Sequence, residues 1–179
     1  MINFKVDVES LKRELDRELI RLSKKIPLAI ARGLNEGGNK VRTQVQHALQ
    51  RQTGLVKYRS VTSRIETISA APTKLNYQII AKGRPAIPIK EFRVKLGPHG
   101  VVAFPWAKEH DFKRSFVGNG RVSGAFIART GMKRFPVRRL FGPSLAKELD
   151  KDESARAFNS SADAFVPLAI EKHLDKLLG

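Results

Sequence analysis

The chain has 179 residues, of which 41% are hydrophobic and 28% charged, a composition typical of one globular domain rather than of two domains with separate cores. It contains no cysteine, which excludes disulfides, a thiolate nucleophile and a sulfur-based zinc site. It also has no apolar run of signal-peptide or membrane-spanning length, so we expect a soluble protein that stays where it is made. The net charge of +17 predicts an anionic partner, because such an excess of positive charge repels itself in a compact monomer.

The charge is unevenly distributed along the chain. Residues 55–143 contain 18 basic and 4 acidic side chains, a balance of +14, whereas the balances of residues 1–54 and 144–179 are +5 and −2. We therefore divide one domain into an N-terminal helical segment (1–54), a basic β-rich core (55–143) and a C-terminal helical segment (144–179).

The first segment is predicted to be a long amphipathic helix. Apolar residues recur at spacings near three and four from Val8 to Leu49. Pro27 lacks an amide donor, so a kink or a break is expected beside it. Gly33, Gly37 and Gly38 put small residues on the stretch that follows, where another backbone can approach closely, and we expect this surface to pack against adjacent subunits.

Short β-type runs punctuated by Gly and Pro follow, from about residue 68 to residue 143. Two antiparallel hairpins are predicted, one around the Gly97–Gly100 turn and one around the Thr130–Lys133 turn. Between them, Lys113–Val122 is expected to be a basic loop that includes a flexible tip at Gly118–Gly120. The expected strands are 77–81, 92–96, 101–104, 124–129 and 134–140.

Helical spacing returns after Ser144, a residue suited to cap a helix. The order of elements predicts an α+β fold. It would consist of a long N-terminal helix, kinked or broken near Pro27, a central mostly antiparallel β-sheet, and C-terminal helices, with the helices packed on one face of the sheet.

Signals for catalysis are weak. The sequence has no phosphate-binding glycine loop and no nucleophile elbow, and its four histidines are scattered. Glu109, His110 and Asp111 are the best local candidates for acid–base chemistry, but adjacent side chains rarely converge, and a solvated turn explains the same residues. Glu91 with Glu109 or Asp111 gives only poor support for a paired-carboxylate hydrolase. We expect no enzyme activity, no cofactor and no metal site.

The basic core interleaves cations with aromatic residues. Such strands can bind single-stranded nucleic acid by charge and base stacking. Alternatively, strand alternation places the aromatic residues in the core and the charges outside, but it does not explain why the outer face is so positive. The candidate residues that contact DNA or a partner are Lys113, Arg114, Arg121, Arg129, Lys133, Arg134, Arg138 and Arg139.

One stretch has a distinctive sequence. It comprises SGAFIAR (123–129), Gly131, KRFPV (133–137) and RRLFGPS (138–144), and it resembles the prophage minor tail protein Z family of long-tailed phages. In that family a Gly-Ala-Phe-Ile segment leads through a basic turn to an Arg-x-Pro-Val/Ile element and a proline-containing entry to a helix. Residues 27–45 also resemble the opening helix of the family.

The resemblance implies a tail completion protein at the head–tail neck of the virion, assembled in the cytoplasm of the bacterial host. It implies a homo-oligomeric ring, with six subunits favoured, that joins the tail to the head and lets DNA pass non-specifically through its lumen. Tail terminator, head-completion or connector, and tape-measure proteins would be its neighbours, and no membrane is involved. Arg134, Pro136, Arg138 and Arg139 would form an interaction strand, and residues 142–144 would fix the turn into the next helix. The alternative is a non-specific nucleic-acid-binding protein.

Overall fold

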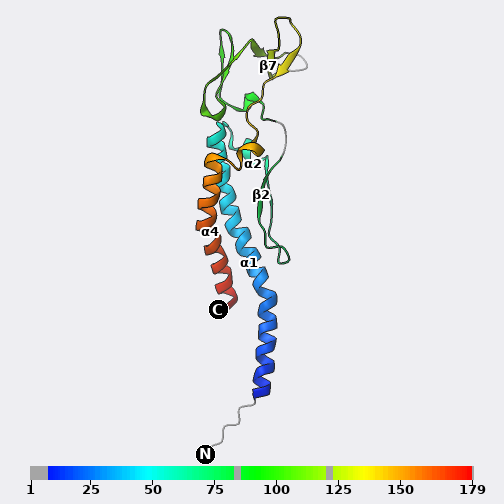
Figure 1. The fold of residues 1–179 in the computed structure, drawn as a ribbon, viewed down its shortest axis with the longest axis vertical. Coiled ribbons are helices and arrows are strands. Elements are labelled where there is room, and N and C mark those ends of the chain that lie inside the picture. The colour runs from blue at the N-terminus through cyan, green and yellow to red at the C-terminus, as the bar shows by residue number, and fades with distance from the viewer. Residues whose placement is uncertain (1–7, 83–85, 120–122, 179) are drawn as a thin grey trace, which may run out of the picture.

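The molecule is an elongated helical shaft with a small β-rich head at one end (Figure 1). The computed structural model describes residues 8–82, 86–119 and 123–178. The shaft consists of α1 (Val8–Thr53) and α4 (Asp152–Leu178), which run antiparallel beside each other. The head comprises the strands between Val94 and Arg139. The α+β class expected from the sequence is confirmed.

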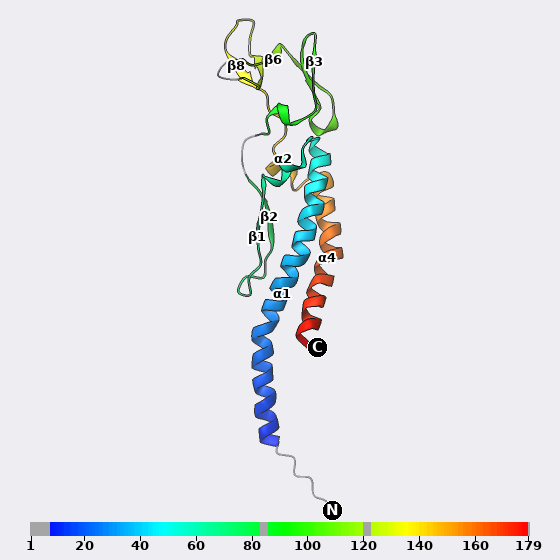
Figure 2. The ribbon, with the colours of Figure 1, turned by 180° about the vertical axis from the view of Figure 1, so that it is seen from behind.

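The long helix α1 is continuous over 46 residues, which corresponds to about 69 Å at 1.5 Å per residue. Pro27 lies inside it without ending it, and the ribbon changes direction along the shaft (Figure 2). Of the two outcomes expected at Pro27, a break is therefore wrong. The second helix, α4, is likewise continuous through Pro167, which is exposed.

Two glycines bring the backbones of α1 and α4 together. A Cβ added at Gly33 would lie 2.6 Å from the Cα of Ile170, and one at Gly37 would lie 2.9 Å from the Cα of Val166. These positions therefore accept only a hydrogen as side chain at this helix separation. The prediction of close packing is confirmed at the glycines, but α4 of the same chain occupies the surface that we expected adjacent subunits to use.

A long hairpin lies along the shaft. It pairs β1 (Ile65–Ile68) with β2 (Gln78–Ala81) in antiparallel register. The Asn35 side chain fastens it to α1 by donating to the Ala70 carbonyl (2.9 Å) and accepting from the Ala70 amide (2.7 Å). These reciprocal bonds satisfy a loop backbone that has no strand partner at that point.

The head contains two three-stranded antiparallel sheets. In the first, β4 (Gly100–Ala103) lies between β3 (Val94–Gly97) and β5 (His110–Lys113). In the second, β7 (Phe126–Arg129) lies between β6 (Ser115–Val117) and β8 (Val137–Arg139). The short helices are α2 (Tyr58–Thr62), η1 (Ile89–Glu91), η2 (Pro105–Ala107) and α3 (Leu145–Glu148).

Both predicted hairpins are confirmed, at β3–β4 and at β7–β8. The strands form three small sheets rather than the one central sheet expected. The helices α1 and α4 pack on each other, and α1 also packs against the two-stranded β1–β2 sheet. The basic loop expected from Lys113 onward is also wrong in part, because β5 ends at Lys113 and β6 begins two residues later. Strands of three or four residues are too short to build one broad sheet that two long helices could cover.

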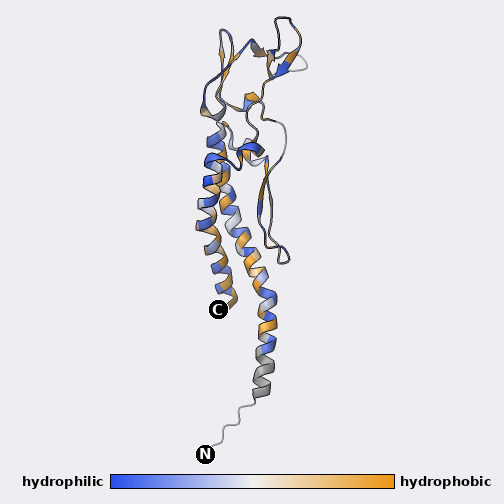
Figure 3. Ribbon diagram, viewed as in Figure 1, coloured by the Kyte–Doolittle hydropathy of each residue, from blue (hydrophilic) through white to orange (hydrophobic). Residues whose placement is uncertain are grey.

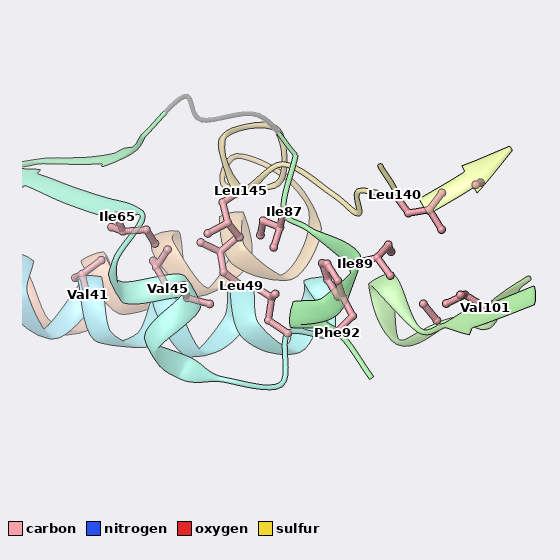
Figure 4. Packing of buried hydrophobic residues seen from close by; sticks show 14 residues of the cluster. Val41, Val45, Leu49, Ile65, Ile87, Ile89, Phe92, Val101, Leu140 and Leu145 are labelled. Atoms are coloured by element: carbon pink, nitrogen blue, oxygen red, sulfur yellow. The ribbon is translucent and has the colours of Figure 1, made fainter. Parts of the chain in front are cut away.

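A single apolar core joins the shaft to the head (Figure 4). The segment 87–92 passes through its middle, and Ile87, Ile89 and Phe92 are at most 3% exposed. Its other buried members come from α1, the α1–α2 connection, α2, β1, β4, β7 and the segment 140–145: Val41, Val45, Leu49, Leu55, Val61, Ile65, Val101, Ala103, Ala128, Leu140 and Leu145.

The turn into α3 is held by the same segment. The Gly142 amide donates to the Ile87 carbonyl (2.7 Å), and the Ile87 amide donates to the Pro143 carbonyl (3.2 Å). Ser144 occupies the N-cap position of α3, as expected, but its side chain makes no capping hydrogen bond. The turn is therefore fixed by backbone pairing rather than by the serine hydroxyl.

The N-terminal part of α1 projects beyond α4. Residues near the end of α4, including His173 and Leu177, lie against Lys25 and Leu28, so the residues of α1 that precede Lys25 extend past them. Leu19 and Ile20 on this projection are 63% and 57% exposed, and Figure 3 shows apolar positions there without a covering element. Among the described helices, none is long and apolar enough to cross a membrane.

Replacing Gly33 by alanine tests the helix contact. Alanine raises helix propensity by about 1 kcal/mol, but its methyl group would overlap the α4 backbone. We expect Gly33→Ala to lower the free energy of unfolding by about 1–3 kcal/mol in urea denaturation. The control is Gly131→Ala, where an added Cβ meets nothing within 4 Å and the change should stay within about 0.5 kcal/mol. Equal stability of the two variants would contradict the close contact.

Glu36 provides a pH-dependent link between the two helices. Its carboxylate accepts from Lys172 Nζ (2.7 Å) and contacts His173 Nε2 (3.0 Å), and these partners hold the pKa of Glu36 below its ordinary value of 4.5. A lowered pKa in the folded state stabilises the fold above the unfolded-state pKa, and that stabilisation is lost as the pH falls through the folded-state value. The stability difference between the wild type and Glu36→Gln should therefore shrink below pH 4.5 in a denaturation series. A difference that stays constant with pH would contradict this link.

Candidate nucleic-acid interface

The predicted basic residues occupy three places in the head rather than one face. Arg114 and Arg129 lie where the two sheets meet, next to Lys113 at the end of β5. Lys133 and Arg134 lie in the turn between β7 and β8, and both are exposed. The other two, Arg138 and Arg139, are on β8. Arg121 lies outside the described residues.

Of the four residues in the interaction strand that the resemblance implies, Arg138 and Arg139 lie on β8, whereas Arg134 and Pro136 precede it. Successive side chains of a strand point to opposite faces, so Arg138 and Arg139 point away from each other. Arg139 lines a small cavity of about 90 Å³ together with Lys90 and Phe141. Pro136 precedes the strand, and Arg134 stacks on Phe135 with 5.7 Å between the guanidinium carbon and the ring centroid.

Arg114 is the only residue between β5 and β6, and it connects the two sheets. Its amide donates to the His99 carbonyl (3.1 Å), and its own carbonyl accepts from the Arg129 amide (3.2 Å). Its φ of +59° is in the left-handed region, which lets the chain turn sharply from one sheet into the other. Backbone pairing thus places His99, Arg114 and Arg129 side by side.

Ser115 ties the two sheets together from the buried side. Its hydroxyl accepts from the Val101 amide (2.7 Å) and donates to the Phe112 carbonyl. Gly100, with φ of +150°, lies under this contact, where an added Cβ would collide with the Phe112 carbonyl. A side chain at position 100 would therefore push β4 away from β5.

These contacts form a hollow that we call the inter-sheet cleft. It has a volume of about 490 Å³. The described residues that line it include two arginines and one histidine but no aspartate or glutamate, which makes the cleft favourable for an anion. Its lining residues are Leu96, Gly97, Pro98, His99, Gly100, Arg114, Ser115, Phe116, Val117 and Arg129.

Some aromatic residues of the basic core are buried, as strand alternation predicts, and others are exposed, as base stacking would require. Phe92 is buried, and Phe112 and Phe126 pack against the core, as strand alternation predicts. Within the described part of the basic core, the exposed aromatic side chains are Trp106 (40%), Phe116 (37%), Phe135 (66%) and Phe141 (44%). The expectation that the aromatic residues are core residues is thus wrong for part of the set.

The catalytic candidates do not converge. His110 and Asp111 are exposed neighbours on β5, so their side chains point to opposite faces of the strand. Glu109 directly precedes the strand, and Glu91 lies elsewhere, in a bidentate pair with Arg64 (2.7 and 3.1 Å). His110 and Asp111 thus lie on a strand rather than in the solvated turn expected. Within the described part of the chain, no three His, Asp or Glu side chains are grouped so that they could hold a metal ion.

Sequence reasoning found Arg114 and Arg129 but not their neighbours in the cleft. His99 was treated as one of four scattered histidines, because nothing local links a hairpin turn to a residue 15 positions later. Comparison with protein-family models, with curated proteins and with solved structures finds no match to this chain.

Ser115→Ala tests the contact that holds the cleft together. Removing the hydroxyl leaves the buried Val101 amide without its acceptor, which should lower the free energy of unfolding by about 1–3 kcal/mol. Ser160→Ala is the control, because that hydroxyl is exposed and bonds only its own helix backbone. Thermal unfolding of both variants measures the difference. If Ser115→Ala were as stable as the control, the serine would not be holding the sheets.

Proposed function

We propose that this chain is a structural virion protein, a tail completion protein at the head–tail neck of a long-tailed phage. In this proposal it forms a homo-oligomeric ring that joins the tail to the head and lets DNA pass. The observation on which it depends is the division of the molecule into a long shaft with an uncovered end and a head dense in cations. The resemblance of residues 123–144 supports the same assignment.

The exposed end of α1 supports assembly. The projection of Val8–Lys24 is about 25 Å long at 1.5 Å per residue, and it lacks a helix beside it among the described residues. Leu19 and Ile20 would lose contact with water if the projections of neighbouring subunits packed together, and burying apolar area is the main favourable term in such association. Bundled projections would place all the heads at the same end of the ring.

The basic head supports a position near DNA or acidic neighbours. A ring multiplies the excess charge of residues 55–143, so one part can face the lumen while another meets the proteins above and below. Contacts between these cations and DNA phosphates would be independent of base sequence, because the phosphates are the same at every base pair. The same head also favours a second candidate function, a free nucleic-acid-binding protein that needs no ring.

The two candidates differ in their DNA binding. A free binding protein should bind tightly at physiological salt, whereas a subunit designed for a ring should bind DNA weakly as a monomer and lose that binding as salt rises. Mass spectrometry of purified particles of the phage that encodes the chain separates them further. Absence of the chain from the particles would rule out the tail completion protein.

Assembly through the projection makes a direct prediction. Leu19→Gln/Ile20→Gln removes two exposed apolar side chains without touching a described core residue. Sedimentation and electron microscopy should show rings for the wild type and monomers for this variant, with an unchanged circular dichroism spectrum. Met132→Gln is the control, because Met132 is 85% exposed in the head and should leave the ring intact. Monomers in all three proteins would contradict the ring.

A further inference from the structure

Backbone pairing preorganises the inter-sheet cleft for an extended anion. The Arg114 amide donates to the His99 carbonyl, and the Arg114 carbonyl accepts from the Arg129 amide. Main-chain hydrogen bonds therefore fix the backbone from which these three side chains extend. The buried Ser115 hydroxyl fixes the strands on either side. A ligand therefore meets a site whose backbone needs no rearrangement, which lowers the entropic cost of binding.

The charges in the cleft are free for a ligand. The Arg114 side chain is exposed, and the lining residues that the structure describes include no aspartate or glutamate to neutralise it. A guanidinium group presents its N–H donors as a planar fork that matches two oxygens of a phosphate. Two such forks in one cleft suit a ligand that repeats its phosphates.

Phe116 orients the second arginine. The guanidinium carbon of Arg129 lies 5.3 Å from the centroid of the Phe116 ring, a cation–π contact that restricts the arginine to one side of β6. Phe116 is itself 37% exposed and lies in the lining of the cleft. An aromatic face beside a fixed arginine can contact the sugar or base attached to a phosphate.

From this geometry we infer that the inter-sheet cleft binds the phosphodiester backbone of DNA, with Arg114 and Arg129 contacting phosphates and Phe116 contacting the adjoining nucleoside. The inference deepens the proposed function, because it assigns the DNA contact to one cleft of each subunit. Phe116 and the repeated cations favour DNA over an acidic peptide, which would need neither an aromatic platform nor a cleft of this volume. The phosphodiester chemistry is common to duplex and single-stranded DNA.

The test is a salt series with fluorescently labelled duplex and single-stranded oligonucleotides and the full-length protein. Replacing both arginines, in Arg114→Gln/Arg129→Gln, should lower affinity at low salt roughly 10- to 100-fold. It should also reduce the slope of log K against log salt by about 2 for the duplex, because each phosphate contact contributes about 0.9. The duplex and single-strand arms show which form of DNA the cleft prefers.

Two controls separate the cleft from bulk charge. Arg156→Gln/Lys176→Gln removes the same charge from exposed positions on α4 of the shaft and should leave both affinity and slope nearly unchanged. Arg129→Lys keeps the charge but loses the fork, so the slope should persist while affinity falls a few-fold. Circular dichroism and thermal melting confirm that each variant is folded. Equal losses in the cleft and shaft variants, or no loss in the cleft variant, would overturn the assignment.

Further arms separate this inference from the proposed function. If polyglutamate binds the cleft through Arg114 and Arg129 and DNA does not, the cleft binds an acidic protein. That result would overturn the DNA site. Arginine-dependent DNA binding by a chain absent from purified particles would support the cleft and reject the tail completion protein. A chain that is present in purified particles, but whose DNA affinity does not change when Arg114 and Arg129 are replaced, would support the tail completion protein and reject the DNA site in the cleft.

Discussion

The burial of one short segment, residues 87–92, is the constraint on which the architecture depends. Ile87, Ile89 and Phe92 are almost fully enclosed, and they contact α1, the first head sheet and the segment leading to α3 in one apolar core. The backbone of the segment pairs with Leu140, Gly142 and Pro143 on one side, and the Glu91 carbonyl accepts from the Val56 amide on the other. Because the shaft and the head pack around this segment, the direction of the head relative to the shaft depends on it.

The shaft and the head use different physical means to stay ordered. In the shaft, two glycines let α1 and α4 approach until their backbones touch, and Glu36 adds an ion pair with Lys172 and a contact with the His173 imidazole near the same level. In the head, the strands are too short to bury much apolar surface, so backbone pairing around Arg114 and Ser115 provides the order instead. The cleft is a consequence of that arrangement, since two small sheets joined through a single residue leave a hollow between them.

Periodicity and turn chemistry in the sequence predicted much of this fold. The spacing of apolar residues predicted α1, and the Gly97–Gly100 and Thr130–Lys133 turns predicted the two hairpins in the right places. The sequence did not predict which strands share a sheet, because that depends on hydrogen bonds between strands that are distant in sequence. For the same reason the basic core was read as one face, whereas strand alternation separates Arg138 from Arg139.

The sequence by itself determined the α+β class, the long helix, the excess of positive charge in residues 55–143 and the identity of the arginines available for binding. These follow from local spacing and composition, which need no knowledge of the fold. Only the tertiary structure decided that α4 covers Gly33 and Gly37, that the end of α1 stays uncovered, and that Arg114 and Arg129 share a cleft with His99. Each of these depends on which surfaces meet, and that is decided by long-range packing and backbone pairing rather than by neighbouring residues.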